Sequence, residues 1–305
     1  MVFLAHDREE IDADGVLVAD PNYLANPPNE TFRSMTSTVP PRDWIDIHWP
    51  DFAGSGPGRW IAVLPLAATE QHGPHLPVGT DVMIALAYLA RVRELLSDAA
   101  PVTFLPMQPV GISTEHIDYP GTLTLPTEVA LKTWLALGES VARAGLKKLV
   151  MVTSHGGNSA AMSLVAQDLR AQHGLLVVTT GWSRLSGAEG LFSAQEASHG
   201  IHGGAAEASI MLAGYREQVR VDALADFRSA GIAMAKDYRW LSTHRPAPFA
   251  WQAQDLHPSG AVGDAREASA EKGEQLIEQG ARAFCELLAD VDRFDPQLLS
   301  NVPKV

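Results

Sequence analysis

The fold is constrained most strongly by a series of short apolar runs that alternate with helix-length segments. The runs cover residues 61–66, 102–106, 148–153 and 175–179, and each has the length of a buried strand. Between and after them, residues 82–96, 128–144, 159–172 and 269–290 have the apolar spacing or the end signals of helices. Strands and helices that alternate in this way predict an α/β fold, with a mainly parallel sheet covered on both faces.

The loop after the first run holds an unusual density of metal-binding side chains. Four of them lie within twelve residues: Glu70, His72, His75 and Asp81. Glycines and prolines between them stiffen the loop, and Thr80 or Asp81 is expected to cap the helix that follows. Open α/β sheets place their chemistry beyond the carboxyl ends of their strands, so this loop is a candidate site.

Two later segments carry side chains of the same kind. His155 follows the third strand directly, in the sequence SHGGN, and therefore emerges at the same sheet edge. Glu207 lies early in an apolar helix, within the polar segment 198–212. Together with Glu70, His72 and Asp81, these residues offer the oxygen and imidazole ligands that suit Zn²⁺, Mn²⁺ or Fe²⁺. Two such ions about 3.5–4 Å apart can convert a shared water into hydroxide.

Each of these residues also has an ordinary structural explanation. Taken alone, His72 and His75 are more typical of histidines that hydrogen-bond within a loop, and Asp81 of a helix N-cap. The turn after His155 has the form of a phosphate cradle at a helix start, and Glu207 that of a solvated helix acid. The convergence of all of them on one sheet edge favours the metal site.

Composition limits the classes of partner. The chain has 36 acidic against 23 basic side chains, a net charge of -13, which disfavours nucleic acid and anionic membranes. It has no apolar run long enough to cross a membrane, and its acidic start is unlike a signal peptide, so a cytoplasmic location is expected. Cys285 is the only cysteine, which rules out a thiolate-rich metal site.

Two regions stand apart from the alternating pattern. Residues 1–42 are rich in Asp, Asn and Pro and predict an N-terminal extension or arm, with disorder as the alternative. Residues 43–305 are expected to form the catalytic domain, with an irregular insertion at about 215–258.

The motifs resemble those of the creatininase family (creatinine amidohydrolase-like proteins) over about residues 43–290. The segments that carry the resemblance are TEQHGPHLPVGTD at 69–81, STEHIDYPGT at 113–122, SHGGN at 154–158 and HGGAAEAS at 202–209. The resemblance implies a three-layer α/β/α sandwich with a mainly parallel sheet, a dinuclear metal centre and a cytoplasmic homo-oligomer, often a hexamer.

Carried over by position, the resemblance implies that Glu70, Asp81 and His155 hold one ion. His72 and Asp81 would hold the second, with Asp81 bridging and Glu207 as the fifth ligand. Creatininase proper has an aromatic residue and a glutamate directly after this histidine. Gly156 and Gly157 stand there in this chain, which argues against creatinine as substrate.

The expected activity is hydrolysis of the C–N bond of a small cyclic or linear amide by a metal-bridging hydroxide. His116 or His202 would carry the proton to the leaving group, with Glu115 orienting His116. Hydrogen bonding that orders the loops is the ordinary role for these two histidines. Arg184 and Arg245 are candidates for binding an anionic group.

Members of this family act on creatinine, a formylamino-pyrimidine nucleotide, a precursor peptide or an inosose ring, so hydrolysis of a ring ketone is an alternative. A phosphate-binding transferase is disfavoured because neither G-x-G-x-x-G nor G-K-[ST] occurs. A non-catalytic, metal-stabilised oligomeric binding protein would need a metal site closed to water.

Overall fold

Four parallel strands form the central sheet of the computed structural model, which describes residues 39–54, 56–243 and 247–299. The strand order is β2-β1-β3-β4. The strands are β1 (Ile61–Leu66), β2 (Val102–Phe104), β3 (Lys148–Thr153) and β4 (Leu176–Gly181). Every residue of β1 and β3 is buried, because helices cover both faces of the two central strands.

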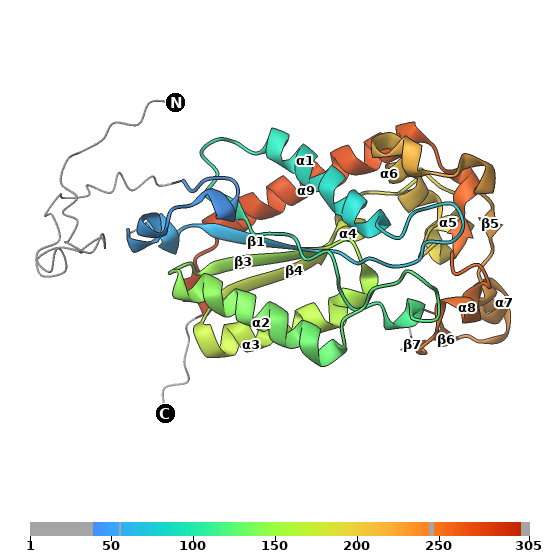
Figure 1. The fold of residues 1–305 in the computed structure, drawn as a ribbon, viewed down its shortest axis with the longest axis horizontal. Coiled ribbons are helices and arrows are strands. Elements are labelled where there is room, and N and C mark those ends of the chain that lie inside the picture. Colours follow the sequence, from blue (N-terminus) through green and yellow to red (C-terminus); the bar gives the residue numbers. More distant parts are fainter. Residues whose placement is uncertain (1–38, 55, 244–246, 300–305) are drawn as a thin grey trace, which may run out of the picture. The chain divides into compact units, whose positions relative to one another are not determined.

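The sheet is the middle of three layers (Figure 1). One face is covered by α1 (Thr80–Leu95), α6 (Ala205–Gly214) and α9 (Ala270–Arg293), and the other by α2 (Thr127–Arg143) and α3 (Ser159–His173). Side chains alternate between the two cores along β1: Ile61 and Val63 join one, Ala62 and Leu64 the other. The predicted three-layer α/β/α sandwich is therefore confirmed.

Smaller elements lie around the carboxyl edge of the sheet and beyond it. They are α4 (Trp182–Leu185), α5 (Ala194–His199), α7 (Ala230–Asp237), α8 (Ala253–Leu256), and the short strands β5 (Asp226–Phe227), β6 (Leu241–Ser242), β7 (Ala247–Pro248) and β8 (Gly263–Asp264). β5 pairs antiparallel with β8, and β6 pairs parallel with β7. Several of them belong to the expected insertion at 215–258, which is thus a chain of short elements.

Local signals in the sequence account for several helix boundaries. The α3 helix ends at Gly174, which adopts a left-handed conformation with φ of 67°. Ser269 caps α9 by accepting a hydrogen bond from the amide of Lys272. The predicted cap of α1 is wrong: the N-cap is Gly79, and Thr80 and Asp81 are the first helical residues.

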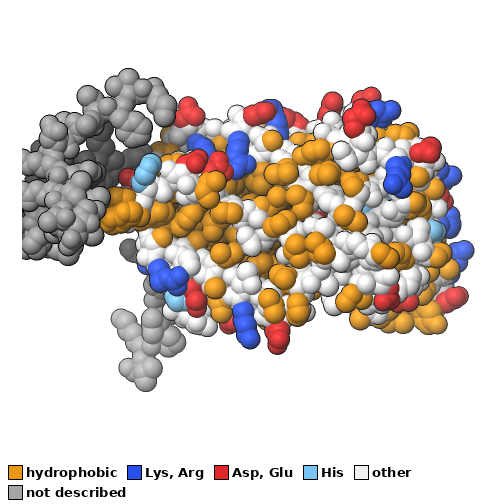
Figure 2. Space-filling view, viewed as in Figure 1, with side chains coloured by type: hydrophobic (Ala, Val, Ile, Leu, Met, Phe, Trp, Pro, Cys, Tyr) orange, Lys and Arg blue, Asp and Glu red, His pale blue; other side chains and the backbone are white. Residues whose placement is uncertain are grey.

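The surface carries large apolar side chains as well as charges. Figure 2 shows apolar side chains spread across the middle of one face, with charged groups mainly around its rim. Ile45 and Trp49, in short turns before β1, are 75% and 82% exposed. The expected homo-oligomer stays a prediction. None of the described helices combines the length and apolarity needed to cross a membrane.

The predicted arm at 1–42 lies almost wholly outside the described residues. Arg42, at its end, packs against the domain: its guanidinium donates to the Ala100 carbonyl at 2.7 Å, and its own carbonyl accepts from Phe104.

Candidate metal centre

The carboxyl ends of β1, β3 and β4 are level with one another. Leu66 pairs with Thr153, and Thr153 pairs with Gly181. The loops that follow β1 and β3 therefore leave the sheet side by side, which brings Glu70 and His155 into one site.

The loop between β1 and α1 is folded back on itself by backbone hydrogen bonds. The amide of Glu70 donates to the Val78 carbonyl at 2.9 Å, and His72 forms a bridge with Leu76. Gly73 turns the chain with φ of 69°, and a Cβ there would lie 2.7 Å from that of Ala261. This loop buries the side chains of Glu70 and His72 almost completely.

Glu70, Asp81 and His155 form the first group of potential ligands. His155 Nδ1 lies 3.1 Å from Glu70 Oε1 and 3.8 Å from Asp81 Oδ2. Asp81 reaches this position because it lies in the first turn of α1, and it is only 1% exposed. The structure thus brings together the three residues predicted to hold one ion.

His72, His202 and Glu207 form a second group beside the first. His72 Nε2 lies 3.6 Å from Glu207 Oε2 and 3.8 Å from Asp81 Oδ2, so Asp81 lies between the two groups. Glu207 is in the first turn of α6 and also accepts a hydrogen bond from the amide of Gly203. The fifth predicted ligand therefore faces the cluster, together with His202, which we expected only as a proton carrier.

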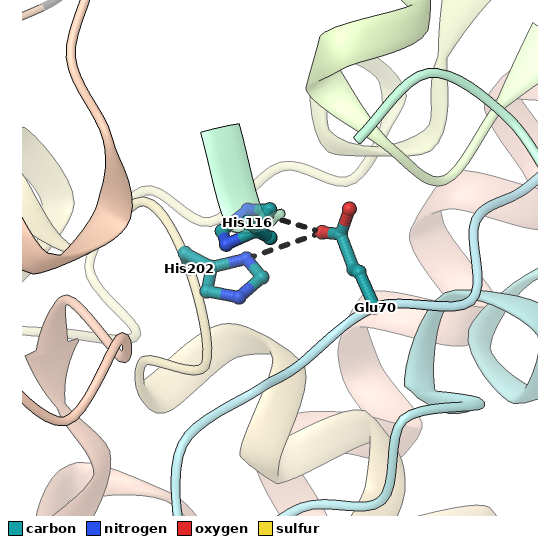
Figure 3. A group of neighbouring side chains, drawn as sticks. All are labelled: Glu70, His116 and His202. Atoms are coloured by element: carbon teal, nitrogen blue, oxygen red, sulfur yellow. Dashed lines mark ion pairs between the residues drawn. The ribbon is translucent and has the colours of Figure 1, made fainter. Parts of the chain in front are cut away.

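A third group consists of Glu70, His116 and His202 (Figure 3). The two rings face the same carboxylate oxygen, with His116 Nε2 at 3.4 Å and His202 Nδ1 at 3.6 Å from Glu70 Oε1. The His202 ring lies between His116 and His72, with centroids 4.1 Å from each. Three adjacent imidazoles disfavour positive charge on one another.

Hydrogen bonds to carbonyl groups fix which ring nitrogen carries the proton. His72 Nδ1 donates to the Glu70 carbonyl at 3.0 Å, and His155 Nε2 donates to the Ile112 carbonyl at 2.7 Å. His202 Nε2 donates to the carbonyl of Gln71 at 2.6 Å. The other nitrogen of each neutral ring then has a free lone pair facing the carboxylates, which is the arrangement that metal-binding histidines adopt.

His116 differs from these three histidines, because one of its ring nitrogens accepts a hydrogen bond from a side chain that we did not predict. The Gln71 amide oxygen accepts from the Gly73 amide, and its nitrogen donates to the Gly260 carbonyl. The same nitrogen lies 2.7 Å from His116 Nδ1, which must therefore accept. The proton of neutral His116 is on Nε2, facing Glu70. No spacing signal in the sequence marks Gln71 for this role.

Burial and charge shift the pKa values of the cluster. Burial lowers the pKa of His72 and of His202 to about 4, and that of His116 to about 2. Burial also disfavours charge on His155, but the neighbouring carboxylates of Glu70, Asp81 and Glu115 raise its pKa to about 10. Burial, followed by the charge of Glu70, raises the pKa of Asp81 well above its ordinary value. Burial and mutual repulsion thus make it costly to ionise all of these carboxylates, and a cation would remove that cost.

Several atoms at the centre of the cluster have no hydrogen-bond partner among the described residues. They are both carboxylate oxygens of Glu70, Nε2 of His72 and Oδ2 of Asp81. The histidine nitrogens that face these oxygens lie 3.1–3.8 Å away, and buried carboxylates without strong hydrogen bonds are costly. Their convergence from separate elements fits a divalent cation held by oxygen and nitrogen.

The other predicted site residues take different positions. His75 lies outside the three groups: its Nε2 donates to the Gly203 carbonyl and its ring stacks on Phe227. The carboxylate that we expected to orient His116 faces His155: Glu115 Oε1 lies 3.6 Å from Nε2 of His155. Arg184 is exposed and does not line the cavity at the cluster, and Arg245 is outside the described residues.

Asn158 joins the loops that carry these groups. Its amide nitrogen donates to the Ala67 carbonyl at 3.1 Å and to Thr153 Oγ1 at 3.2 Å. Its oxygen accepts from the amide of Ile112 at 3.0 Å. This buried side chain fixes the loop that carries Glu115 and His116 against the ends of β1 and β3.

A cavity of about 230 Å³ lies over the cluster. Its lining consists of Asp81, Glu115, His116, Ser154, His155, Gly156, Gly157, Ile201, His202, Glu207, Thr243 and Trp251. The last two come from the insertion, which therefore forms part of the wall.

Comparison with known proteins identifies the family. The family model described as creatinine amidohydrolase matches residues 46–288. The chain belongs to the creatininase family. It is 33% identical over 227 residues to the mycofactocin precursor peptide peptidase of Mycobacterium ulcerans (strain Agy99), covering 72% of this chain and 82% of that protein. The matching family model and the named relatives are hydrolases, a peptidase and a creatinine amidohydrolase. This creatininase-family chain is therefore an enzyme of the amidohydrolase type.

Two further relatives extend the comparison. The creatinine amidohydrolase of Pseudomonas putida is 26% identical over 250 residues, covering 76% of this chain and 90% of that protein. A solved structure of creatininase with Mn has a TM-score of 0.65 and 23% identity, covering 83% of this chain and 99% of that one. At this identity the likeness to the solved structure establishes the fold of the creatininase-family member described here.

Proposed function

We propose that this protein is a dinuclear metal-dependent hydrolase that cleaves the C–N bond of an amide. The observation that carries the proposal is the set of buried, unpartnered atoms on Glu70, His72 and Asp81, which converge where three ligand groups meet. The native ions would be Zn²⁺, Mn²⁺ or Fe²⁺, since all ligands offer oxygen or imidazole nitrogen.

The ligands divide into two sets that share one carboxylate. Glu70 and His155 would hold one ion, and His72 and Glu207 the other. Asp81 Oδ2 lies 3.8 Å from a nitrogen of each set's histidine, which suits a bridging role. When bound, such ions lower the pKa of a shared water and polarise the substrate carbonyl.

The attacking water would supply the proton that the leaving nitrogen needs, and the protein's own residues would orient the leaving group. His116 lines the cavity and carries its proton on Nε2, 3.4 Å from Glu70 Oε1. His202 uses its protonated nitrogen in a hydrogen bond to the Gln71 carbonyl. Of the two candidate proton carriers, we therefore assign to His116 a hydrogen bond from Nε2–H that orients the leaving group, because a neutral imidazole does not give up this proton.

The substrate that we propose is a linear amide of the peptide class. Support comes from the peptidase relative and from Gly156 and Gly157, which leave the rim of the cavity without side chains. The open cavity over the cluster disfavours a purely structural metal site, whose coordination positions would all be filled by protein.

The test combines metal analysis with turnover. Protein purified without chelator should contain close to two divalent ions per chain and hydrolyse members of a panel of peptides, formamides and lactams. The Asp81→Asn variant should lose bound metal and nearly all turnover. Asp168→Asn, on the exposed side of α3, is the matched control and should retain both. Full turnover after chelation, or metal content unaffected by Asp81→Asn, would contradict the proposal.

A further inference from the structure

A second cavity, of about 220 Å³, lies next to the one over the metal centre. The two cavities share Ser154 and Glu207 in their linings, so they adjoin at the site itself. The second cavity extends away from the carboxylates, between α1, α6 and α9. Its walls are largely apolar and include Ile84, Trp182, Phe192, Ile210 and Leu276.

Packing holds the aromatic part of this wall in place. Trp182 directly follows β4, at the carboxyl edge of the sheet. Its ring stacks on Tyr88 with centroids 4.6 Å apart and planes 3° apart, and it also contacts Phe284. Phe192 lies below the ammonium of Lys272, whose Nζ is 4.9 Å from the ring centroid. The cavity is therefore largely preformed, as small-molecule sites usually are.

Two residues of the lining each carry a buried polar atom without a hydrogen-bond partner among the described residues. These atoms are Oγ of Ser154 and Nε1 of Trp182. The carboxylate of Glu196 also lines the cavity, but it already accepts from the amides of Ala205 and Asp264.

The volume of the cavity limits the size of the ligand group that it can hold. An apolar protein cavity of about 150 Å³ takes up benzene. A cavity of about 220 Å³ therefore has room for a phenyl ring or a large aliphatic side chain.

We propose that this cavity is a specificity subsite that binds an apolar side chain beside the scissile amide, so that the substrate is a peptide or amino-acid amide with a large hydrophobic residue. This inference rests on the proposed amidase function and narrows its substrate class.

Direct binding tests the subsite separately from turnover. The probes are N-acetyl-phenylalanine amide and N-acetyl-glycine amide, titrated calorimetrically into the metal-loaded full-length enzyme. Burial of a phenyl side chain predicts about 10- to 100-fold tighter binding of the phenylalanine probe. Equal affinities for the two probes would overturn the subsite. A clear preference without hydrolysis of any amide would instead overturn the proposed function and leave the subsite standing.

Two variants locate the binding in this cavity. Ala188→Phe should fill it, and Phe192→Ala should remove part of its wall, because both residues line the cavity and neither is in a ligand group. Each should reduce the phenylalanine-over-glycine preference about tenfold. The control Ala160→Phe, on the exposed side of α3, should keep it. If one variant unfolds at a lower temperature than the wild type, the affinities of the other variant decide the test. A preference that survives in a folded variant, or that is lost in the control as well, would overturn the assignment.

Discussion

The carboxylate of Glu115 occupies the space that a side chain at position 157 would need. A Cβ added to Gly157 would lie nearest to His155 Nε2, and 2.6 Å from both Glu115 Oε1 and the carbonyl oxygen of Ile112. That carbonyl accepts the hydrogen bond that orients His155. The absence of a side chain at Gly157 therefore makes room for the acid beside the metal-site histidine.

Substitution of this glycine should weaken the metal site. Gly157→Ala must displace the His155 ring as well as Glu115 or the Ile112 backbone, and such overpacking typically costs about 1–3 kcal/mol. Because the partner of His155 moves, metal affinity should fall by about 10-fold or more. Gly156→Ala is the matched control, since a Cβ there has no neighbour within 4 Å. Metal titration by calorimetry checks both, and equal affinities for the two variants would show that the contact is unimportant.

Gln71 should control the reactivity of His116 without touching the metal. Gln71→Leu removes the donor to His116 Nδ1, so the ring is free to move its proton to that nitrogen. Loss of such an orienting partner costs about 10- to 100-fold in activity or metal affinity. We expect the loss mainly in kcat, measured on an amide that the wild type cleaves. Gln279→Leu, at an exposed position of α9, is the control. An unchanged kcat in Gln71→Leu would show that the hydrogen bond from Gln71 to His116 does not affect turnover.

Removal of metal should lower thermal stability, because the buried carboxylates lose their counter-charge. A ligand present at about 100 times its Kd stabilises the folded state by about 2.7 kcal/mol, which corresponds to about 5–10 °C in Tm for a domain of about 150–250 residues. Melting curves with and without a chelator measure the difference. A Tm that is indifferent to chelation and to added Zn²⁺ or Mn²⁺ would argue against a buried metal centre.

The stabilisation by metal should increase with pH above neutrality. The pKa of His155 is about 10 in the folded, metal-free protein, against 6.5 as its ordinary value. The folded state therefore binds more protons than the unfolded state between these values, and this contribution to stability is lost as pH rises towards 10. Metal replaces the proton on His155, so the metal-loaded protein should lose less stability than the metal-free protein as pH rises. Tm measured from pH 7 to 9 should show a growing gap between the two forms, and a constant gap would contradict this linkage.

Much of the framework could be predicted from the chain because its signals are local. The strands 61–66 and 148–153 have the predicted bounds, since an apolar run bounded by turn formers requires only its own residues and burial. The close grouping of Glu70, Asp81 and His155 was predictable because parallel strands end at one edge, whatever the details of the loops.

Only the tertiary structure decided which way the loop side chains point. His75 and His72 are three residues apart in one loop, yet one stacks on Phe227 and the other joins the ligands. No spacing signal distinguishes Gln71 from other residues beside a ligand, and its role depends on carbonyl groups and rings far along the chain. Sequence spacing therefore determined which edge of the sheet holds the chemistry. Long-range hydrogen bonds, which no local pattern encodes, decided the role of each group there.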